Sequence, residues 1–402
     1  MSIYGCAMSD SSFDSPSDGA AAHARRAAGP VAGPQPPACV TAADRSMRDP
    51  ARSFLLGPLL KGVSRSFYLT LRVLPAGMRD PVGLAYLLAR AADTIADTPL
   101  IEPALRLRML LTLRAHVNDA EHDRGPLREM ARQLAAQHQQ SDERRLLESL
   151  EPALAILQQL AERDREAVRG IVSTLTRGME FDLTTFAHER SGQMVALRAW
   201  HELDQYTYMV AGCVGAFWTE MTYMHLPRVL HGDPVAMSAR GVRFGKALQL
   251  TNVLRDCAKD LRIGRCYLPS TMLERYGLTP RDLLSAEAAG RARPVMLELV
   301  RHALDQFRDA IDYTLAIRRS APRLRLACLW PIVIGLKTLL LLVNSANWLV
   351  PEPAAKVRRQ QVYGVIVTSI ALVGSNTLLR AWLERLIAAI ECRLHCTSRE
   401  GG

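Results

Sequence analysis

The chain carries, at residues 86–97, the stretch YLLARAADTIAD, in which two aspartates stand four positions apart among apolar residues. At 3.6 residues per turn, Arg90, Asp93 and Asp97 fall on one stripe, and leucine, alanine and isoleucine side chains fill the opposite face. The spacing therefore predicts an amphipathic helix that presents two neighbouring carboxylates on one side.

A second stretch, QLTNVLRDCAKD at residues 249–260, repeats this arrangement. Asn252, Asp256 and Asp260 share one helical face, opposite leucine and cysteine side chains. Gly264 follows one turn later, at a position where glycine commonly ends a helix. The repetition predicts two similar acidic helices in one protein.

Aspartates at positions i and i+4 place two negative charges about 5–6 Å apart, which is unfavourable unless a cation lies between them. Carboxylate oxygens suit Mg²⁺, which commonly takes one or two carboxylates and completes its coordination with water and ligand phosphates. A single pair of this kind is most often ordinary solvated helix surface. Two pairs in apolar helices, each with an arginine nearby (Arg90 and Arg255), favour a metal-bridged diphosphate site.

The rest of the chain is helical in pattern from Pro58 onward, because long Ala-, Leu-, Arg- and Glu-rich stretches show almost no strand-like alternation. Proline and glycine mark the expected helix ends, among them Gly125, Pro234 and Pro322. With 402 residues and 49% hydrophobic content, the chain can bury a large core, which excludes a wholly disordered, collagen-like or coiled-coil protein. We expect an all-α fold.

The charge balance is basic, with 50 Lys and Arg against 40 Asp and Glu and a net charge of +10. This balance favours anionic partners, such as phosphorylated ligands or an acidic membrane surface. Basic runs are few, and we expect a monomer with no nucleic-acid partner. The eight cysteines include no metal-type CxxC pair, which fits a reduced, cytoplasmic compartment better than a disulfide framework.

Residues 1–46 differ in composition from the rest of the chain. Ala, Ser, Asp, Gly and Pro dominate them, and they contain no apolar run of signal-peptide length. Their small apolar surface cannot offset the entropy lost on ordering. We expect residues 1–46 to form a disordered tail and residues 47–402 to form one domain, with a start site at Met47 as an open alternative.

Five short segments follow one another along the chain. They are SRSF at 64–67, DTIAD at 93–97, LTRGMEFD at 175–182, LDQYTYMVAGCVG at 203–215 and NVLRDCAKDLRIGRCYLP at 252–269. In order and spacing they resemble the squalene/phytoene synthase family of head-to-head prenyl diphosphate synthases, and squalene synthase most of all. The resemblance extends from about Leu55 to Leu386, which is nearly everything after the tail.

The resemblance implies a single-domain isoprenoid synthase helical fold around a central apolar cavity, where two farnesyl or geranylgeranyl diphosphates couple through a cyclopropylcarbinyl diphosphate. It implies Mg²⁺ as a cofactor, held by Asp93, Asp97, Asn252, Asp256 and Asp260. Diphosphate oxygens would be bound by Ser64, Arg65, Ser66, Arg90, Asn252, Arg255 and Arg265. The four aspartates would be catalytic together with Tyr206, which the family uses for proton handling or cation stabilisation. Without the resemblance, a tyrosine on a buried helix is more often a core residue.

Reduction by NADPH separates squalene from phytoene-type products. The chain has no GxGxxG signature, but AKVRRQQV at 355–362 resembles the Lys-Ile-Arg-Lys segment of squalene synthases. Lys356, Arg358 and Arg359 would then bind the cofactor, and a solvated basic turn is the alternative. We expect condensation of two farnesyl diphosphates through presqualene diphosphate to squalene. The alternatives are a phytoene or dehydrosqualene synthase without reduction, and an inactive relative with a binding or assembly role, against which the four retained aspartates argue.

Two apolar segments lie in the C-terminal third, at 326–336 and 339–343, interrupted by Pro331 and Lys337. Neither reaches the roughly 20 uninterrupted apolar residues that span a bilayer, so we expect a buried core helix. A helix lying in the membrane interface is the alternative, because prenyl substrates and products carry long hydrocarbon tails. We expect peripheral contact with the cytoplasmic face of the membrane.

Overall fold

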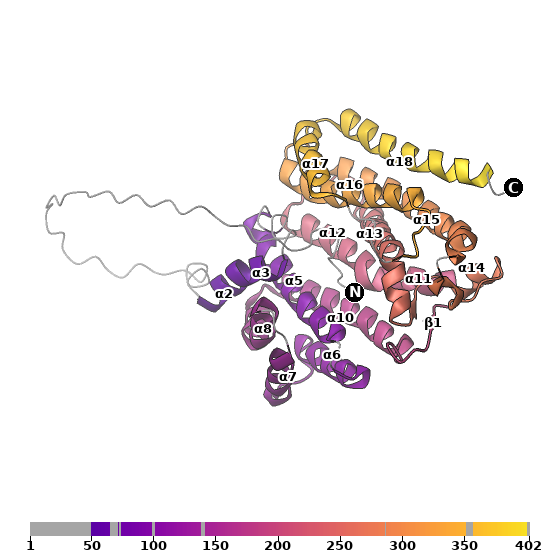
Figure 1. Ribbon diagram of the computed structural model, residues 1–402. Coiled ribbons are helices and arrows are strands. Elements are labelled where there is room, and N and C mark those ends of the chain that lie inside the picture. Colours follow the sequence, from indigo (N-terminus) through magenta and orange to yellow (C-terminus); the bar gives the residue numbers. More distant parts are fainter. Residues whose placement is uncertain are drawn as a thin grey trace, which may run out of the picture.

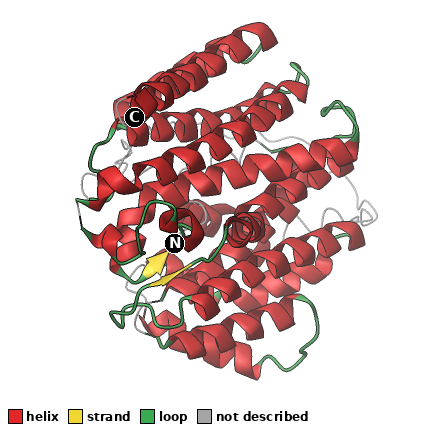
Figure 2. Cartoon of the chain, turned by 90° about the vertical axis from the view of Figure 1, so that its right-hand side faces the viewer, coloured by secondary structure: helices red, strands yellow, loops and turns green. Residues whose placement is uncertain are grey.

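The computed structural model describes residues 50–64, 71, 74–98, 101–137, 141–285, 287–350 and 357–399. Within these ranges the chain is helical almost throughout (Figures 1 and 2). The expected all-α fold is confirmed. The expected tail at residues 1–46 lies outside the described residues, and its disorder and the start at Met47 stay predictions.

The described helices pack as one assembly together with one small two-stranded sheet. In chain order they are α2 (Pro50–Phe54), the π-helical η1 (Leu55–Leu59), α3 (Leu60–Ser64), α5 (Ala76–Asp97), α6 (Pro103–Val117), α7 (Gly125–Gln137), α8 (Ser141–Glu148), α9 (Leu150–Gln159), α10 (Glu162–Thr185), α11 (Trp200–Thr207), the π-helical η3 (Tyr208–Gly212), α12 (Cys213–His225), α13 (Pro234–Arg262), α14 (Ser270–Glu274), the 3-10 turn η4 (Asp282–Leu284), α15 (Ala288–Ala316), α16 (Pro322–Asn344), α17 (Arg359–Leu372) and α18 (Asn376–Arg399). Strands β1 (Val195–Ala196) and β2 (Arg265–Cys266) pair in parallel, with Val195 opposite Arg265.

Helix α5, which carries the first acidic stretch, lies inside the assembly and packs against α10, α6 and α9. Residues 81–89 and 91–96 are buried, so the helix is covered on nearly every side. The predicted helix is confirmed, and Asp93 of its acidic stripe is buried, whereas Asp97 is exposed. A buried carboxylate needs a cation or hydrogen-bond donors, so this placement already marks the stripe as unusual.

Helix α13, which carries the second acidic stretch, is held close to α12 and η3 by glycines. A Cβ atom on Gly215 would overlap the Gly241 carbonyl, and one on Gly245 would overlap the Ala211 carbonyl. Only glycine permits such close backbone approach. Gly264, at φ +88°, follows the end of α13 as expected.

The core consists of two contiguous apolar clusters. One is built mainly on α5, α6, α9 and α10, and the other on α13, α15, α16 and α18. The two apolar segments of the C-terminal third lie on one continuous helix, α16, with Pro331 and Lys337 inside it. This helix is long and apolar enough to cross a membrane, but 61% of its most apolar window is buried in the protein, as expected for a core helix.

Candidate active site

The first acidic pair lies at the C-terminal end of α5. Asp93 is buried and receives an ion pair from Arg90, whose Nη1 lies 2.6 Å from Asp93 Oδ2. Burial raises the pKa of Asp93 to about 7, and the nearby charge of Asp97 adds to the effect despite the arginine. Asp97 is exposed. Arg90 also contacts Glu143 of α8 at 2.7 Å, so one guanidinium joins two acids.

The second acidic set lies on the last turns of α13. Asn252 and Asp260 are buried, and Asn252 Oδ1 and Asp260 Oδ2 have no hydrogen-bond partner among the described residues. Burial, together with the charge of Asp256, raises the pKa of Asp260 to about 7. Asp256 is half-buried and accepts two hydrogen bonds from the Arg255 guanidinium, at 2.9 and 2.6 Å. Two buried oxygens therefore lack partners on one helical face.

A small cavity lies beside the first acidic pair. It is lined by Asp93, Ala96, Asp97, Met179, Asp182, Leu183, Tyr206, Val210 and Arg265. Its volume is about 20 Å³, room for roughly one water molecule. The first acidic pair thus faces a tyrosine, a third aspartate and an arginine from three other segments.

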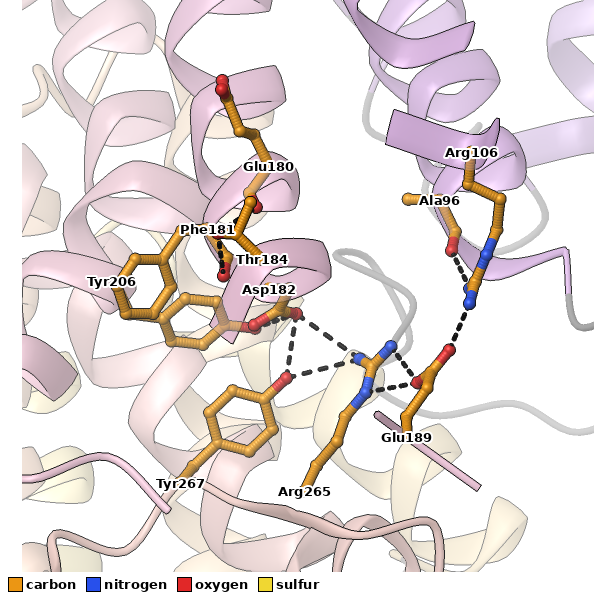
Figure 3. Close-up of polar contacts among 10 residues, drawn as sticks. All are labelled: Ala96, Arg106, Glu180, Phe181, Asp182, Thr184, Glu189, Tyr206, Arg265 and Tyr267. Carbon is orange, nitrogen blue, oxygen red and sulfur yellow. Dashed lines mark hydrogen bonds and ion pairs between the residues drawn. The ribbon is translucent and has the colours of Figure 1, made fainter. Parts of the chain in front are cut away.

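Two tyrosine hydroxyls converge on that third aspartate, Asp182 of α10, as Figure 3 shows. Tyr206 and Tyr267 stack with ring centroids 4.9 Å apart, and both donate to Asp182 Oδ2, at 3.3 and 2.8 Å respectively. Burial raises the pKa of Asp182, although the positive charge of Arg265 opposes the shift. Burial also raises the pKa of Tyr206 well above its ordinary value, so its hydroxyl is a neutral donor at physiological pH.

An arginine–glutamate–arginine chain continues the network away from Asp182 (Figure 3). Arg265 Nη1 lies 3.5 Å from Asp182 Oδ2, and its Nε donates to Glu189 Oε2 at 2.7 Å. Glu189 Oε1 accepts a second hydrogen bond from Arg106 at 2.5 Å. Arg106 in turn donates to the carbonyl oxygen of Ala96 at 2.7 Å, inside the last turn of α5. The network therefore links the end of α5 to the segment that follows α13.

A family model described as Squalene/phytoene synthase matches residues 60–361, about three quarters of the chain. The chain belongs to the squalene/phytoene synthase family. The match includes both acidic helices, the two tyrosines and the arginine–glutamate chain.

Individual relatives agree with this assignment. The chain is 30% identical over 257 residues to a bifunctional lycopene cyclase/phytoene synthase of Colletotrichum graminicola, and the match covers 62% of this chain but only 40% of that enzyme. It is 25% identical over 326 residues to squalene synthase ERG9 of Saccharomyces cerevisiae, covering 81% of this chain and 69% of the yeast enzyme. The fold is similar to that of TcSQS in complex with the ligand BPH1237, with a TM-score of 0.65, 21% identity and coverage of 87% and 99%.

Several residues that the family resemblance assigned can be placed. Tyr206 lines the cavity, whereas Tyr208, two positions on in η3, is 40% exposed. Ser64 is buried at the end of α3, and its hydroxyl donates to the Leu60 carbonyl of its own helix. Arg265 also lines the cavity, through the network described above.

Other assigned residues lie partly or wholly outside the described residues. These are Arg65, Ser66 and Lys356, and for Arg359 the backbone but not the side chain is described. Arg358 precedes α17 and is exposed, with its backbone N–H donating to Gln361 Oε1 at 3.1 Å. The NADPH assignment therefore stays a prediction.

Four residues of the network were not among the predicted site residues. Asp182 and Tyr267 lie inside two of the five family segments, so their position in those motifs was a usable signal. Arg106 and Glu189 lie in no motif and become visible only through their contacts in the fold.

Proposed function

We propose that this protein condenses two prenyl diphosphates head to head and releases diphosphate. The observation that carries the proposal is the placement of two acidic helix ends within a family fold, each with a buried carboxyl group whose pKa is raised to about 7. Perturbed carboxyl groups of this kind in a cavity are typical of ligand and catalytic sites. Membership of the family supports the reaction class.

The donor set fits Mg²⁺. Asn252 Oδ1 and Asp260 Oδ2 are buried oxygens without a partner among the described residues, and Mg²⁺ prefers oxygen donors. The described residues contain no group of three acidic, histidine or cysteine side chains that could hold one ion by themselves. Such a site suits an ion that takes one or two carboxylates and completes its shell with phosphate oxygens. Asp93 and Asp97 would hold ions on one side, and Asn252, Asp256 and Asp260 on the other.

Bound Mg²⁺ would supply Lewis-acid stabilisation of the diphosphate leaving group. The arginines supply the rest of the positive charge. Arg90 and Arg255 lie beside the two acidic sets, and Arg265 lines the cavity. A guanidinium fork matches the geometry of phosphate oxygens, so these side chains would bind and orient the diphosphates.

The tyrosine pair serves the hydrocarbon end of the reaction. Tyr206 is 2% exposed, and its hydroxyl is oriented by Asp182 Oδ2. A buried, oriented phenol can hold a proton close to a cation without admitting water, and its ring face is electron-rich. We propose that Tyr206 stabilises the carbocation and handles the proton, and that Tyr267 supports its ring by stacking.

For the product, we propose squalene formed from farnesyl diphosphate with NADPH as reductant. The 25% identity to a squalene synthase over most of both chains supports this choice. The 30% identity to a fungal phytoene synthase supports the second candidate, phytoene or dehydrosqualene formation without reduction.

One experiment separates these possibilities. The purified protein is incubated with Mg²⁺ and either farnesyl or geranylgeranyl diphosphate, with and without NADPH, and the products are identified by mass spectrometry. Squalene that appears only with NADPH supports the proposal. The same product with and without NADPH would favour the second candidate, and the absence of any condensed product would leave an inactive relative with a binding role.

We also propose peripheral contact with an anionic membrane, made by α17 and not by the buried α16. Residues 360–379 contain no charged side chain. Tyr363, Val367 and Ile370 lie about one turn apart on α17 and are 49%, 69% and 57% exposed. Helix α17 packs against α16 near the edge of the assembly (Figure 1), and the exposed fractions of these three side chains show that the described residues leave this face uncovered. Apolar side chains of this spacing suit a helix lying in the membrane interface.

An exposed arginine lies at the N-terminal end of this face. Arg358 precedes α17 and is exposed. Positive charge around an apolar face favours anionic lipid headgroups.

Co-sedimentation with vesicles tests this surface. The protein should bind phosphatidylglycerol vesicles more strongly than phosphatidylcholine vesicles, and Val367→Ser with Ile370→Ser should weaken binding several-fold. Leu284→Ser, which changes an exposed apolar side chain on η4, serves as the control. Equal binding by the double variant and the wild type would show that α17 is not the contact.

A further inference from the structure

The loop that follows α10 is fixed onto the segment that follows α13. The backbone N–H of Arg190 donates to the Ile263 carbonyl at 2.9 Å, and that of Val195 donates to the Gly264 carbonyl at 3.0 Å. Arg190 adopts φ 63°, which is uncommon for a residue other than glycine. Directly before it, Glu189 is thereby held in one place relative to β2.

The Glu189 carboxylate is buried and uses both of its oxygens. Oε1 accepts from Arg106 Nη2 at 2.5 Å, and Oε2 accepts from Arg265 Nε at 2.7 Å and lies 2.5 Å from Arg265 Nη2. All three side chains are at most 6% exposed. Burial alone would raise the pKa of Glu189, but the two guanidinium groups lower it below its ordinary value. The carboxylate is therefore charged and shared between two buried cations.

Each of the two arginines reaches a different part of the site. Arg106 Nη1 donates to the Ala96 carbonyl at 2.7 Å, and Ala96 stands between Asp93 and Asp97 on the last turn of α5. An arginine at the last carbonyls of a helix both satisfies them and opposes the negative end of the helix dipole. Arg265 extends instead to the cavity wall, 3.5 Å from Asp182 Oδ2.

We propose that Glu189 is a positioning residue that couples the two halves of the diphosphate site, holding Arg265 at the cavity and, through Arg106, the acidic end of α5. This inference rests on the proposed function, because it assumes that residues around the cavity bind a diphosphate. Without the Glu189 charge, Arg265 keeps Asp182 as its remaining carboxylate partner and turns toward it. The guanidinium then leaves the position from which it meets a diphosphate.

The test compares Glu189→Gln with a matched control. Glu180→Gln removes a carboxylate of α10 that, like Glu189, pairs with an arginine of α6. Glu180 Oε2 lies 2.7 Å from Arg114 Nη1, but this pair does not touch the cavity. For both variants, binding of inorganic pyrophosphate with Mg²⁺ is measured by calorimetry, KM and kcat are measured with farnesyl diphosphate, and helical circular dichroism and melting temperature are recorded.

We expect Glu189→Gln to weaken pyrophosphate binding and to raise KM by about 10- to 100-fold, the usual range for losing a group that orients a ligand-binding side chain. The effect on kcat should be smaller, and Glu180→Gln should leave pyrophosphate binding and KM within about twofold of the wild type. Pyrophosphate binding and KM unchanged in Glu189→Gln, or weakened equally by both variants, would overturn the proposal and leave Glu189 a purely structural residue.

Two further outcomes are informative. If Glu189→Gln does not fold, Arg106→Lys replaces it, because lysine keeps the charge but cannot bridge the Ala96 carbonyl and Glu189 together; wild-type pyrophosphate binding in Arg106→Lys would then overturn the proposal. If the wild type forms no condensed product but binds pyrophosphate in a Glu189-dependent way, the proposed function fails while the coupling stands.

Discussion

The carboxyl group of Asp260 should destabilise the metal-free protein at neutral and alkaline pH. Its side chain is buried on α13 and Oδ2 has no partner among the described residues, and burial raises its pKa from 3.8 to about 7. Because the folded-state pKa is higher than that of the unfolded chain, folding favours the protonated form. The contribution of the protonated Asp260 to the free energy of unfolding is fully present below about pH 4 and is lost as the pH rises to about 7.

The size of the effect follows from the two pKa values. A difference of about three between the folded and unfolded chain corresponds to about 4 kcal/mol of unfolding free energy. Asp260→Asn keeps the shape of the side chain and removes the charge. At pH 8 the variant should therefore be more stable than the wild type by up to about 4 kcal/mol, and at pH 4.5 by about 1 kcal/mol or less. For a chain of 402 residues the unfolding entropy is about 0.8 kcal/mol/K, so the melting temperature should differ by about 5 °C at pH 8.

Thermal unfolding with EDTA present measures this difference at both pH values. Glu148→Gln, which neutralises an exposed carboxylate at the end of α8, is the control and should shift the melting temperature little at either pH. Addition of Mg²⁺ with pyrophosphate at pH 8 should then stabilise the wild type more than Asp260→Asn. Equal melting temperatures for wild type and variant in EDTA at pH 8, or a less stable variant, would refute the claim that the Asp260 carboxyl group is buried without a partner and destabilises the protein when charged.

Three further predictions concern other parts of the chain. A chain that begins at Met47 should keep the activity and melting temperature of the full chain, and a fall of several degrees would show that the preceding segment packs on the domain. Lys356→Ala with Arg358→Ala should raise the NADPH concentration needed for squalene formation without slowing formation of the cyclopropyl intermediate. The two products are assayed separately, and an equal loss of both steps would count against a cofactor site there. Tyr206→Phe should lower kcat by about 10- to 1000-fold while leaving pyrophosphate binding intact, whereas Tyr208→Phe should remain active, and full activity of Tyr206→Phe would exclude a role for its hydroxyl.

Helical periodicity made the two acidic stretches predictable. The spacing of Asp93 and Asp97, and of Asp256 and Asp260, depends only on local geometry, and both helices are present with these carboxylates at their C-terminal ends. Gly264 ended the second helix as expected, because a positive φ at that point excludes most other residues.

Contacts between distant segments could not be predicted in the same way. Arg106 and Glu189 are 83 positions apart, and Glu189 and Arg265 are 76 apart, and neither pair follows any local period. Charged residues outside a motif are usually solvated, so their sequence gives no sign that all three are buried together. Only the packing of the loop after α10 on the segment after α13 brings them into contact.

Helix α16 shows how tertiary burial can outweigh a local preference. Proline removes a backbone donor and disfavours a helix interior by about 3 kcal/mol, yet Pro331 lies inside this helix. The neighbouring Leu329, Ile332 and Val333 are fully buried, and burying side chains of this size contributes about 1.5–3 kcal/mol each. Tertiary burial therefore outweighs the proline, and the helix continues from Pro322 to Asn344.

A mixed-label condensation tests the central claim most directly. The protein is supplied with Mg²⁺, NADPH and equal amounts of unlabelled and fully deuterated farnesyl diphosphate, and the hydrocarbon product is analysed by mass spectrometry. Joining of two prenyl units predicts unlabelled, half-labelled and fully labelled product in a ratio of about 1:2:1, and Asp93→Asn or Asp256→Asn should abolish this product while helical circular dichroism stays unchanged. A product without the half-labelled species, or an Asp256→Asn protein that condenses at the wild-type rate, would contradict the account of two acidic helices acting on two prenyl diphosphates.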